Sequence, residues 1–128
     1  MNKSREALVQ TINDQLKDTT IEELKSRKGG DFRFPVFLNS EFMDRDVTEL
    51  ELSVRSYNCL RRAGFRRIGD LVDHIDGKED LLKIHNLGRK SADEILMNLF
   101  LFHYSVMRPE RKENYIERVK KMNQQRQD

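Results

Sequence analysis

The sequence predicts an all-α protein, and three observations support this prediction. Apolar residues recur at helical spacing in several segments, most clearly at Ala92, Ile95, Leu96 and Leu99, which would lie on one face of a helix. None of the 128 residues falls in a stretch with the strict apolar–polar alternation that is typical of a half-buried strand. Serine, glycine and proline stand where such helices would begin and end. We therefore expect helices joined by tight turns.

The first 45 residues are expected to form an N-terminal extension to the main domain. Residues 4–28 have apolar side chains at i, i+4 and i+8 spacing and are predicted to be helical. Residues 32–38 form an apolar patch interrupted by proline, which predicts an extended segment. We expect this segment to cover the helical domain, with an interface for a partner as the alternative. The acidic stretch 41–51 is expected to be a linker.

The main helical domain is predicted over residues 46–105. Ser53 is a favourable N-cap residue for its first helix, and Gly64 is expected to end that helix. The stripe predicted to face the core consists of Val54, Tyr57, Leu60 and Ala63. Two further short helices are expected, one from Ile68 and one over 79–84.

Residues 81–91 have the form of a helix-hairpin-helix motif. Asn86, Leu87 and Gly88 form a tight turn between a short helix and a long one, and Lys90 and Ser91 follow in the first turn of the long helix. The unpaired backbone N–H groups at such a helix start, with the added charge and hydroxyl, can bind a phosphate. An ordinary helix connection through a glycine turn would give the same pattern.

The C-terminal residues 106–128 are predicted to be a charged tail. Its helix is expected from about 110 to 123, and its apolar positions are sparse. This tail, the extension and the central domain complete the predicted organisation of the chain.

The net charge of +2 conceals a segregated pattern. Residues 53–69 hold five arginines and no acid, and residues 82–92 hold three basic residues and no acid, while residues 70–81 between them hold five acids. Such segregation indicates a localised positive surface, although solvated faces on alternating helices would give the same blocks.

One polar helix face adds to this pattern. Arg55, Asn58 and Arg62 lie at i, i+3 and i+7 and therefore share one face. Arginine beside asparagine suits a groove lined by acceptors and phosphates. A solvated polar face accounts for Arg62 equally well.

Several function classes are excluded by what the sequence lacks. It shows no nucleophile triad, metal-ligand spacing, carboxylate pair or phosphate-binding loop, so we expect no catalysis, no cofactor and no metal. The single cysteine, Cys59, excludes an internal disulfide; we expect it to be buried and unreactive, with a redox role as the alternative. The absence of a long apolar run or signal pattern predicts a soluble, cytoplasmic protein without a membrane partner.

Three motifs together carry a family resemblance. They are VTELELSVRSYNCL at 47–60, IGDL at 68–71 and NLGRKS at 86–91. With them, residues 46–100 resemble the C-terminal domain of the bacterial RNA polymerase alpha subunit, in the form found in Gram-positive bacteria. The resemblance implies a compact helical domain that binds double-stranded, A·T-rich upstream promoter DNA in the minor groove. By position, the residues that it implies contact DNA are Arg55, Asn58, Asn86, Gly88, Lys90, Ser91 and Glu94.

The resemblance and the charge pattern suggest a role for each group. Arg55 would enter the narrow groove, whose negative potential attracts arginine. Lys90, Ser91 and the N–H groups after Gly88 would hold neighbouring phosphates. Glu94 would orient Arg55 or a neighbouring donor.

A protein-facing surface is also implied. The family's acidic patch for the sigma factor maps onto Glu49 and Glu51, and a surface used by transcription regulators includes Tyr57 and Arg61. We expect a stand-alone, non-catalytic DNA-binding protein of transcription, without the family's large N-terminal domain. The alternatives are a protein-interaction module with weak DNA affinity and, far less favoured, an accessory to a repair-type enzyme. The sequence does not predict the oligomeric state.

Overall fold

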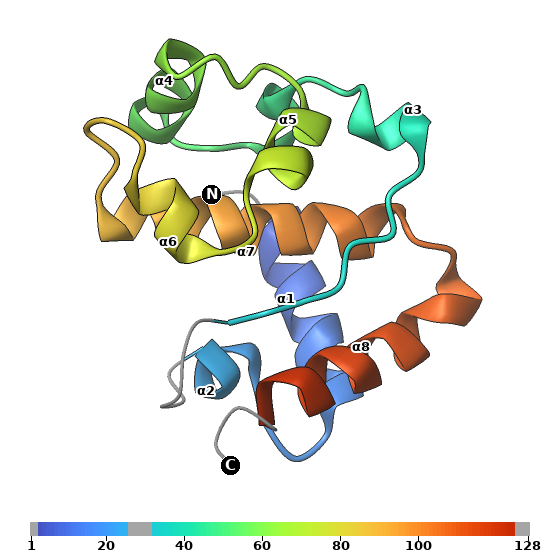
Figure 1. The fold of residues 1–128 in the computed structure, drawn as a ribbon. Helices are drawn as coiled ribbons and strands as arrows, with labels where there is room; N and C mark the ends of the chain where they lie inside the picture. Colours follow the sequence, from blue (N-terminus) through green and yellow to red (C-terminus); the bar gives the residue numbers. More distant parts are fainter. Residues whose placement is uncertain (1–2, 26–31, 125–128) are drawn as a thin grey trace. The chain divides into compact units, whose positions relative to one another are not determined.

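The computed structural model describes residues 3–25 and 32–124, which belong to two compact units (Figure 1). Unit 1 comprises residues 1–35 and 104–128, and unit 2 comprises residues 36–103. The described residues contain helices and no strand; an isolated bridge pairs Asp46 with Arg67. The all-α prediction is therefore confirmed. Residues 1–45 and 106–128 were predicted as separate segments, whereas unit 1 contains residues from both ends of the chain.

Unit 2 carries the hairpin and the basic segments. Its helices are α3 (Ser40–Met43), η1 (Val47–Leu50), α4 (Val54–Arg62), α5 (Ile68–His74), α6 (Lys78–Leu82) and most of α7 (Arg89–Val106). Its buried apolar side chains include Val47, Leu50, Leu60, Ile68, Leu71, Leu81, Leu87, Ala92 and Ile95. Burial of apolar surface on this scale is the main source of the unit's stability.

The prediction of an acidic linker at 41–51 is wrong, because this stretch contains α3 and η1. Val47 and Leu50 in η1 are 0% and 3% exposed. The carboxylate of Asp46 caps η1 by accepting a hydrogen bond from the backbone N–H of Thr48 (2.9 Å). Acidic side chains thus occupy the cap position and the solvent side of η1, whose apolar residues enter the core.

Helices α3 and α5 approach closely at Gly69. A Cβ atom at this buried glycine would lie 3.0 Å from the backbone oxygen of Met43, which is tighter than ordinary van der Waals contact. The absence of a side chain at Gly69 is therefore what lets α5 lie against the end of α3 (Figure 1).

The predicted ends of α4 are confirmed. Ser53 is its N-cap, and its Oγ accepts a hydrogen bond from the Ser56 N–H (3.3 Å). At the other end, Gly64 adopts φ +93°, while the N–H groups of Gly64 and Phe65 reach back to the carbonyls of Arg61 and Leu60. This pair of bonds is a Schellman motif, which glycine favours because it adopts the left-handed conformation without strain.

The predicted buried stripe of α4 is wrong in part. Val54 is 76% exposed and Ala63 is exposed, whereas Ser56, Cys59 and Leu60 are buried. The buried face is therefore rotated from the one that apolar spacing indicates. The reason is that Ser56, although polar, finds hydrogen-bond partners inside the unit.

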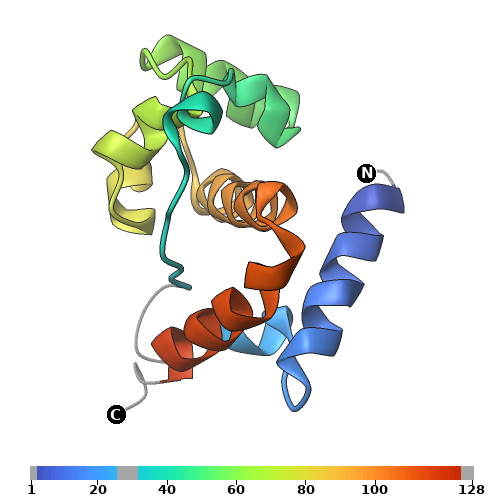
Figure 2. The ribbon, with the colours of Figure 1, turned by 90° about the vertical axis from the view of Figure 1, so that its right-hand side faces the viewer.

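Unit 1 is formed from both ends of the chain. It contains α1 (Lys3–Leu16), α2 (Ile21–Lys25) and α8 (Pro109–Gln124), and Figure 2 shows α1 alongside α8. Its buried side chains include Ile12, Leu16, Ile21, Leu24, Tyr104, Tyr115, Ile116 and Val119. The stretch 4–28, predicted as helical, has a break at Lys17, whose φ is +69°, and its last residues lie outside the described part.

The extended segment near residue 35 is held mainly within unit 1. The side-chain amide of Asn123 donates to the carbonyl of Arg33 and accepts from its N–H, both at 2.8 Å, and the Tyr115 hydroxyl donates to the carbonyl of Pro35 (2.7 Å). In unit 2, the N–H of Phe37 donates to His103 (2.8 Å). Of this extended segment, which was predicted to cover the helical domain, only the end near Phe37 bonds to a residue of unit 2 in these contacts.

Candidate nucleic-acid interface

An open hollow on unit 2 brings together residues from the two predicted DNA-binding segments. It has a volume of about 340 Å³ and is lined by Arg55, Asn58, Cys59 and Arg62 of α4 and by Asn86 of the hairpin. Three of these residues belong to the predicted DNA-contacting set. The lining combines guanidinium and amide groups and contains no carboxylate, which suits an anionic, hydrogen-bonding ligand.

Glu94 positions the start of α4, from which Arg55 projects. Its carboxylate accepts hydrogen bonds from the Ser53 N–H (2.7 Å), the Ser53 hydroxyl (2.9 Å) and the Ser56 hydroxyl. This carboxylate on α7 therefore caps α4 from outside that helix, a favourable place for a negative charge. Of the two roles suggested for Glu94, these contacts favour orientation of neighbouring donors.

The hairpin presents Asn86 to the hollow in a left-handed conformation. Its φ is +65°, a region that asparagine tolerates better than most residues. Its carbonyl accepts a hydrogen bond from the Cys59 thiol (3.6 Å), which ties the hairpin to α4. Leu87 is 5% exposed and anchors the turn, and Cys59 is also 5% exposed, so its predicted burial is confirmed.

The first turn of α7 follows directly after the hairpin. Gly88 and Lys90 are exposed, while Ser91 is only 8% exposed. The N–H of Ala92 donates to the carbonyl of Gly88, so the preceding N–H groups of this turn have no acceptor within the helix.

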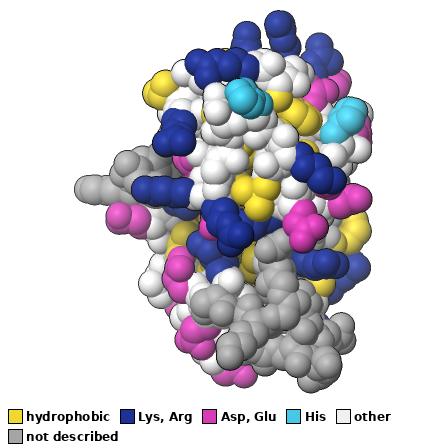
Figure 3. Space-filling view, turned by 60° about the vertical axis from the view of Figure 1, so that its left-hand side comes forward, with side chains coloured by type: hydrophobic (Ala, Val, Ile, Leu, Met, Phe, Trp, Pro, Cys, Tyr) yellow, Lys and Arg dark blue, Asp and Glu magenta, His cyan; other side chains and the backbone are white. Residues whose placement is uncertain are grey.

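The basic side chain of Arg55 at the hollow is not neutralised by an acidic neighbour among the described residues. Within the described part of the chain, Arg55 forms no ion pair. By contrast, the Asp70 carboxylate accepts the backbone N–H groups of Arg66 and Arg67 (both 2.9 Å), and these bonds lower its pKa. Figure 3 shows several Lys and Arg side chains gathered at the top of the face that it draws.

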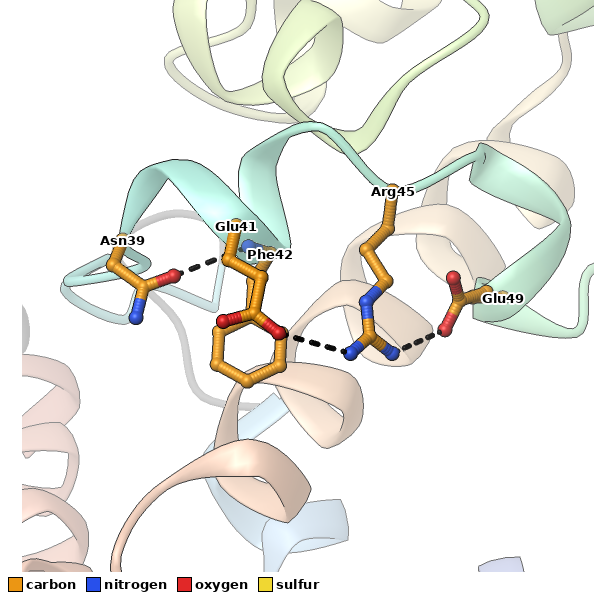
Figure 4. A network of polar contacts seen from close by, with 5 residues as sticks. All are labelled: Asn39, Glu41, Phe42, Arg45 and Glu49. Atoms are coloured by element: carbon orange, nitrogen blue, oxygen red, sulfur yellow. Dashed lines mark hydrogen bonds and ion pairs between the residues drawn. The ribbon is translucent and has the colours of Figure 1, made fainter.

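The predicted protein-facing residues lie on different elements. Glu49 is in η1, and its carboxylate binds the guanidinium of Arg45 (2.9 Å), which also lies 3.7 Å from Glu41 and 5.0 Å from the Phe42 ring centroid (Figure 4). Arg45 therefore neutralises part of the acidic patch. Glu51 follows η1 with a left-handed φ of +53°.

Tyr57 and Arg61 form a pair on α4. The Arg61 guanidinium donates to the Tyr57 hydroxyl (2.8 Å) and lies 5.6 Å from the ring centroid. This contact orders both side chains one turn apart on the helix.

Three contributors to this region lie outside the predicted set of DNA-contacting residues. Cys59 was expected in the core, with a redox role as the alternative, and Arg62 was placed only on the polar face that it shares with Arg55; both line the hollow. Asn98 is buried, and its amide donates to the carbonyls of Leu50 (3.0 Å) and Glu51 (3.4 Å), holding the end of η1. A polar residue within the apolar stripe of the long helix was the available signal for Asn98.

The described residues contain neither a metal-binding cluster nor a membrane-spanning helix. No group of three or more His, Cys, Asp or Glu side chains there could hold a metal ion. Among the helices described, none is both long and apolar enough to cross a membrane.

Comparison with known proteins identifies the family of unit 2. The family model for the C-terminal domain of the bacterial RNA polymerase alpha chain matches residues 38–100. Residues 38–100 belong to this family. The alpha C-terminal domain is a DNA-binding component of transcription, and its match begins and ends within unit 2.

Two relatives of the alpha C-terminal domain show the extent of the similarity. The DNA-directed RNA polymerase subunit alpha of Symbiobacterium thermophilum is 44% identical over 71 residues, which are 56% of this chain and 22% of that protein. The corresponding subunit of Moorella thermoacetica is 47% identical over 57 residues, 44% of this chain and 18% of that protein. The alignments thus span about a fifth of the length of these relatives.

Proposed function

We propose that this protein is a non-catalytic transcription component whose unit 2 binds A·T-rich duplex DNA in the minor groove. The observation that carries the proposal is the hollow in which Arg55 and Asn58 of α4 meet Asn86 of the hairpin. These side chains offer donors to the acceptors that line the minor-groove floor. The family of residues 38–100 supports DNA as the ligand.

Arg55 is the group proposed to read the groove. It is exposed, lies in the first turn of α4 and is free of ion pairs within the described residues. A·T-rich tracts have a narrow minor groove with enhanced negative potential, which favours an inserted arginine. Preference for A·T-rich DNA would therefore depend on Arg55 more than on the other basic residues.

The start of α7 is proposed to hold the sugar–phosphate backbone. Its first N–H groups, which have no acceptor within the helix, carry the positive end of the helix dipole, and the exposed Lys90 adds a full charge beside them. Contacts of this kind position a protein on the duplex without reading its sequence. Lys90 and Arg55 thus have separable roles.

The separation of roles can be tested by DNA binding. Arg55→Ala is expected to cost about 2–3 kcal/mol on an A-tract duplex and to remove most of the preference over a G·C-rich duplex. Lys90→Ala should weaken both duplexes about equally and reduce the salt slope by roughly one unit. Fluorescence anisotropy on both duplexes across a salt series measures these effects, and equal losses for Arg55→Ala on both would contradict groove insertion.

A second proposal concerns a protein partner, sigma factor or a transcription regulator. It is supported by the ordered Tyr57–Arg61 pair, because aromatic and arginine side chains are enriched among residues that dominate protein interfaces. Glu49 and Glu51 would contribute the acidic part, with Arg45 displaced from Glu49. Titration of purified sigma factor against wild type and Tyr57→Ala tests it, and equal affinities would refute it.

A further inference from the structure

Arg62 occupies the end of the hollow opposite Arg55 along α4. It is the last residue of α4, is exposed, and lines the hollow together with Arg55, Asn58 and Asn86. Seven residues of α-helix rise about 10 Å, so Arg55 and Arg62 project from points about 10 Å apart along the helix. The two arginines therefore lie at the two ends of the part of α4 that lines the hollow.

The neighbouring arginine is engaged elsewhere. Arg61 is held on the Tyr57 side of α4 by its bond to the Tyr57 hydroxyl and its stacking on that ring. In the part of the chain that the structure describes, Arg62 has no ion pair. Arg61 and Arg62 both lie in the last turn of α4, where the helix dipole favours either cation equally. The dipole therefore does not explain why Arg62 lines the hollow.

We propose that Arg62 binds a backbone phosphate of the duplex, on the strand that flanks the groove entered by Arg55. The inference rests on the proposed DNA-binding function. The minor groove is only about 6 Å wide, so a cation about 10 Å from the inserted Arg55 lies over the groove wall instead of its floor. Arginine can bind phosphate there through two parallel N–H bonds.

The test compares Arg62→Ala with Arg66→Ala. Arg66 belongs to the same basic block, and its substitution removes the same single charge. It lies outside the hollow and near Asp46, and its charge helps to lower the pKa of that carboxyl group. Fluorescence anisotropy is measured on an A-tract duplex and on a G·C-rich duplex between 50 and 200 mM salt. Over this span about 6–10 phosphate contacts change the affinity by 10³–10⁵, so the slope of log affinity against log salt is well resolved. Chemical denaturation of each variant confirms that it is folded.

The expected result is specific to a phosphate contact. Arg62→Ala should weaken binding to both duplexes equally, by roughly 5–10-fold near 0.1 M salt, and should reduce the salt slope by about 0.9. Arg62→Lys retains the charge and should retain the slope, while Arg66→Ala should change affinity less than about twofold, as a distant screened charge does.

Each other outcome overturns a defined part of the argument. If wild type binds and Arg55→Ala weakens it, but Arg62→Ala matches Arg66→Ala, the role of Arg62 is wrong and the proposed function stands. A loss on Arg62→Ala confined to the A-tract duplex would also overturn the phosphate contact. If wild type binds neither duplex, the proposed function itself fails.

Discussion

Removal of the Glu94 carboxylate should destabilise unit 2 at the start of α4. In Glu94→Ala, the Ser53 N–H and two serine hydroxyls lose their common acceptor, and Ser56 is fully buried. A hydrogen bond to a charged acceptor contributes about 1.5–3 kcal/mol, and an N-cap about 0.5–2 kcal/mol. Because the three bonds share one carboxylate and are not additive, we expect a loss of about 2–3 kcal/mol in the free energy of unfolding.

Urea denaturation gives a direct measurement of this loss. With a slope of about 1–3 kcal/mol per M, the midpoint should fall by about 0.7–3 M. Asp93→Ala is the matched control, because Asp93 is the adjacent acidic residue but forms an ion pair with Lys78 (2.8 Å) in which its side chain is half exposed. Such a surface pair contributes at most about 1 kcal/mol.

The same variants connect stability to DNA binding. Because Arg55 lies in the turn that Glu94 caps, Glu94→Ala should also weaken DNA binding where the protein remains folded. If Glu94→Ala destabilises the protein no more than Asp93→Ala, the capping role is refuted. If it weakens DNA binding without any loss of stability, Glu94 acts on the DNA and not through α4.

Two further predictions concern buried side chains. Burial lowers the pKa of His103 from 6.5 to about 4. As the pH falls, this histidine is therefore protonated in the unfolded chain before it is protonated in the folded protein. The free energy of unfolding is highest above about pH 6.5 and falls by up to about 3 kcal/mol toward pH 4. Urea denaturation at pH 7, 5.5 and 4 should show a steeper pH dependence for wild type than for His103→Gln, and parallel curves would contradict this. Cys59, which is 5% exposed, should react with a thiol reagent at least roughly tenfold more slowly in the native protein than in urea; equal rates would show that its thiol is accessible.

Local signals in the sequence predict much of unit 2. Ser53 and Gly64 mark the ends of α4 because an N-cap hydroxyl and a left-handed glycine act through residues at most five positions away. The hairpin at Asn86 and the basic start of α7 are local in the same way. The candidate interface was therefore predictable as two separate segments.

Contacts between distant segments determined the rest. The buried face of α4 includes Ser56 because Glu94, 38 residues later, accepts its hydroxyl, and apolar spacing contains no information about that partner. Two residues that line the hollow, Cys59 and Asn86, lie 27 residues apart, and the Cys59 thiol donates to the carbonyl of Asn86. The helix face that a residue occupies follows from its local position, but whether that face is buried, and what it meets, depends on where the rest of the chain folds.

The ends of the chain show the same division most clearly. The sequence by itself indicated that residues 110–123 could form a charged helix after Pro109, although its apolar positions are sparse. Only the tertiary structure showed that Asn123 pairs with the backbone of Arg33, 90 residues earlier, and that Lys120 reaches the carbonyl of Leu16, 104 residues earlier. A backbone group can be satisfied by any suitable side chain that the fold brings near it, so its partner is decided by proximity in space and not by a pattern along the chain.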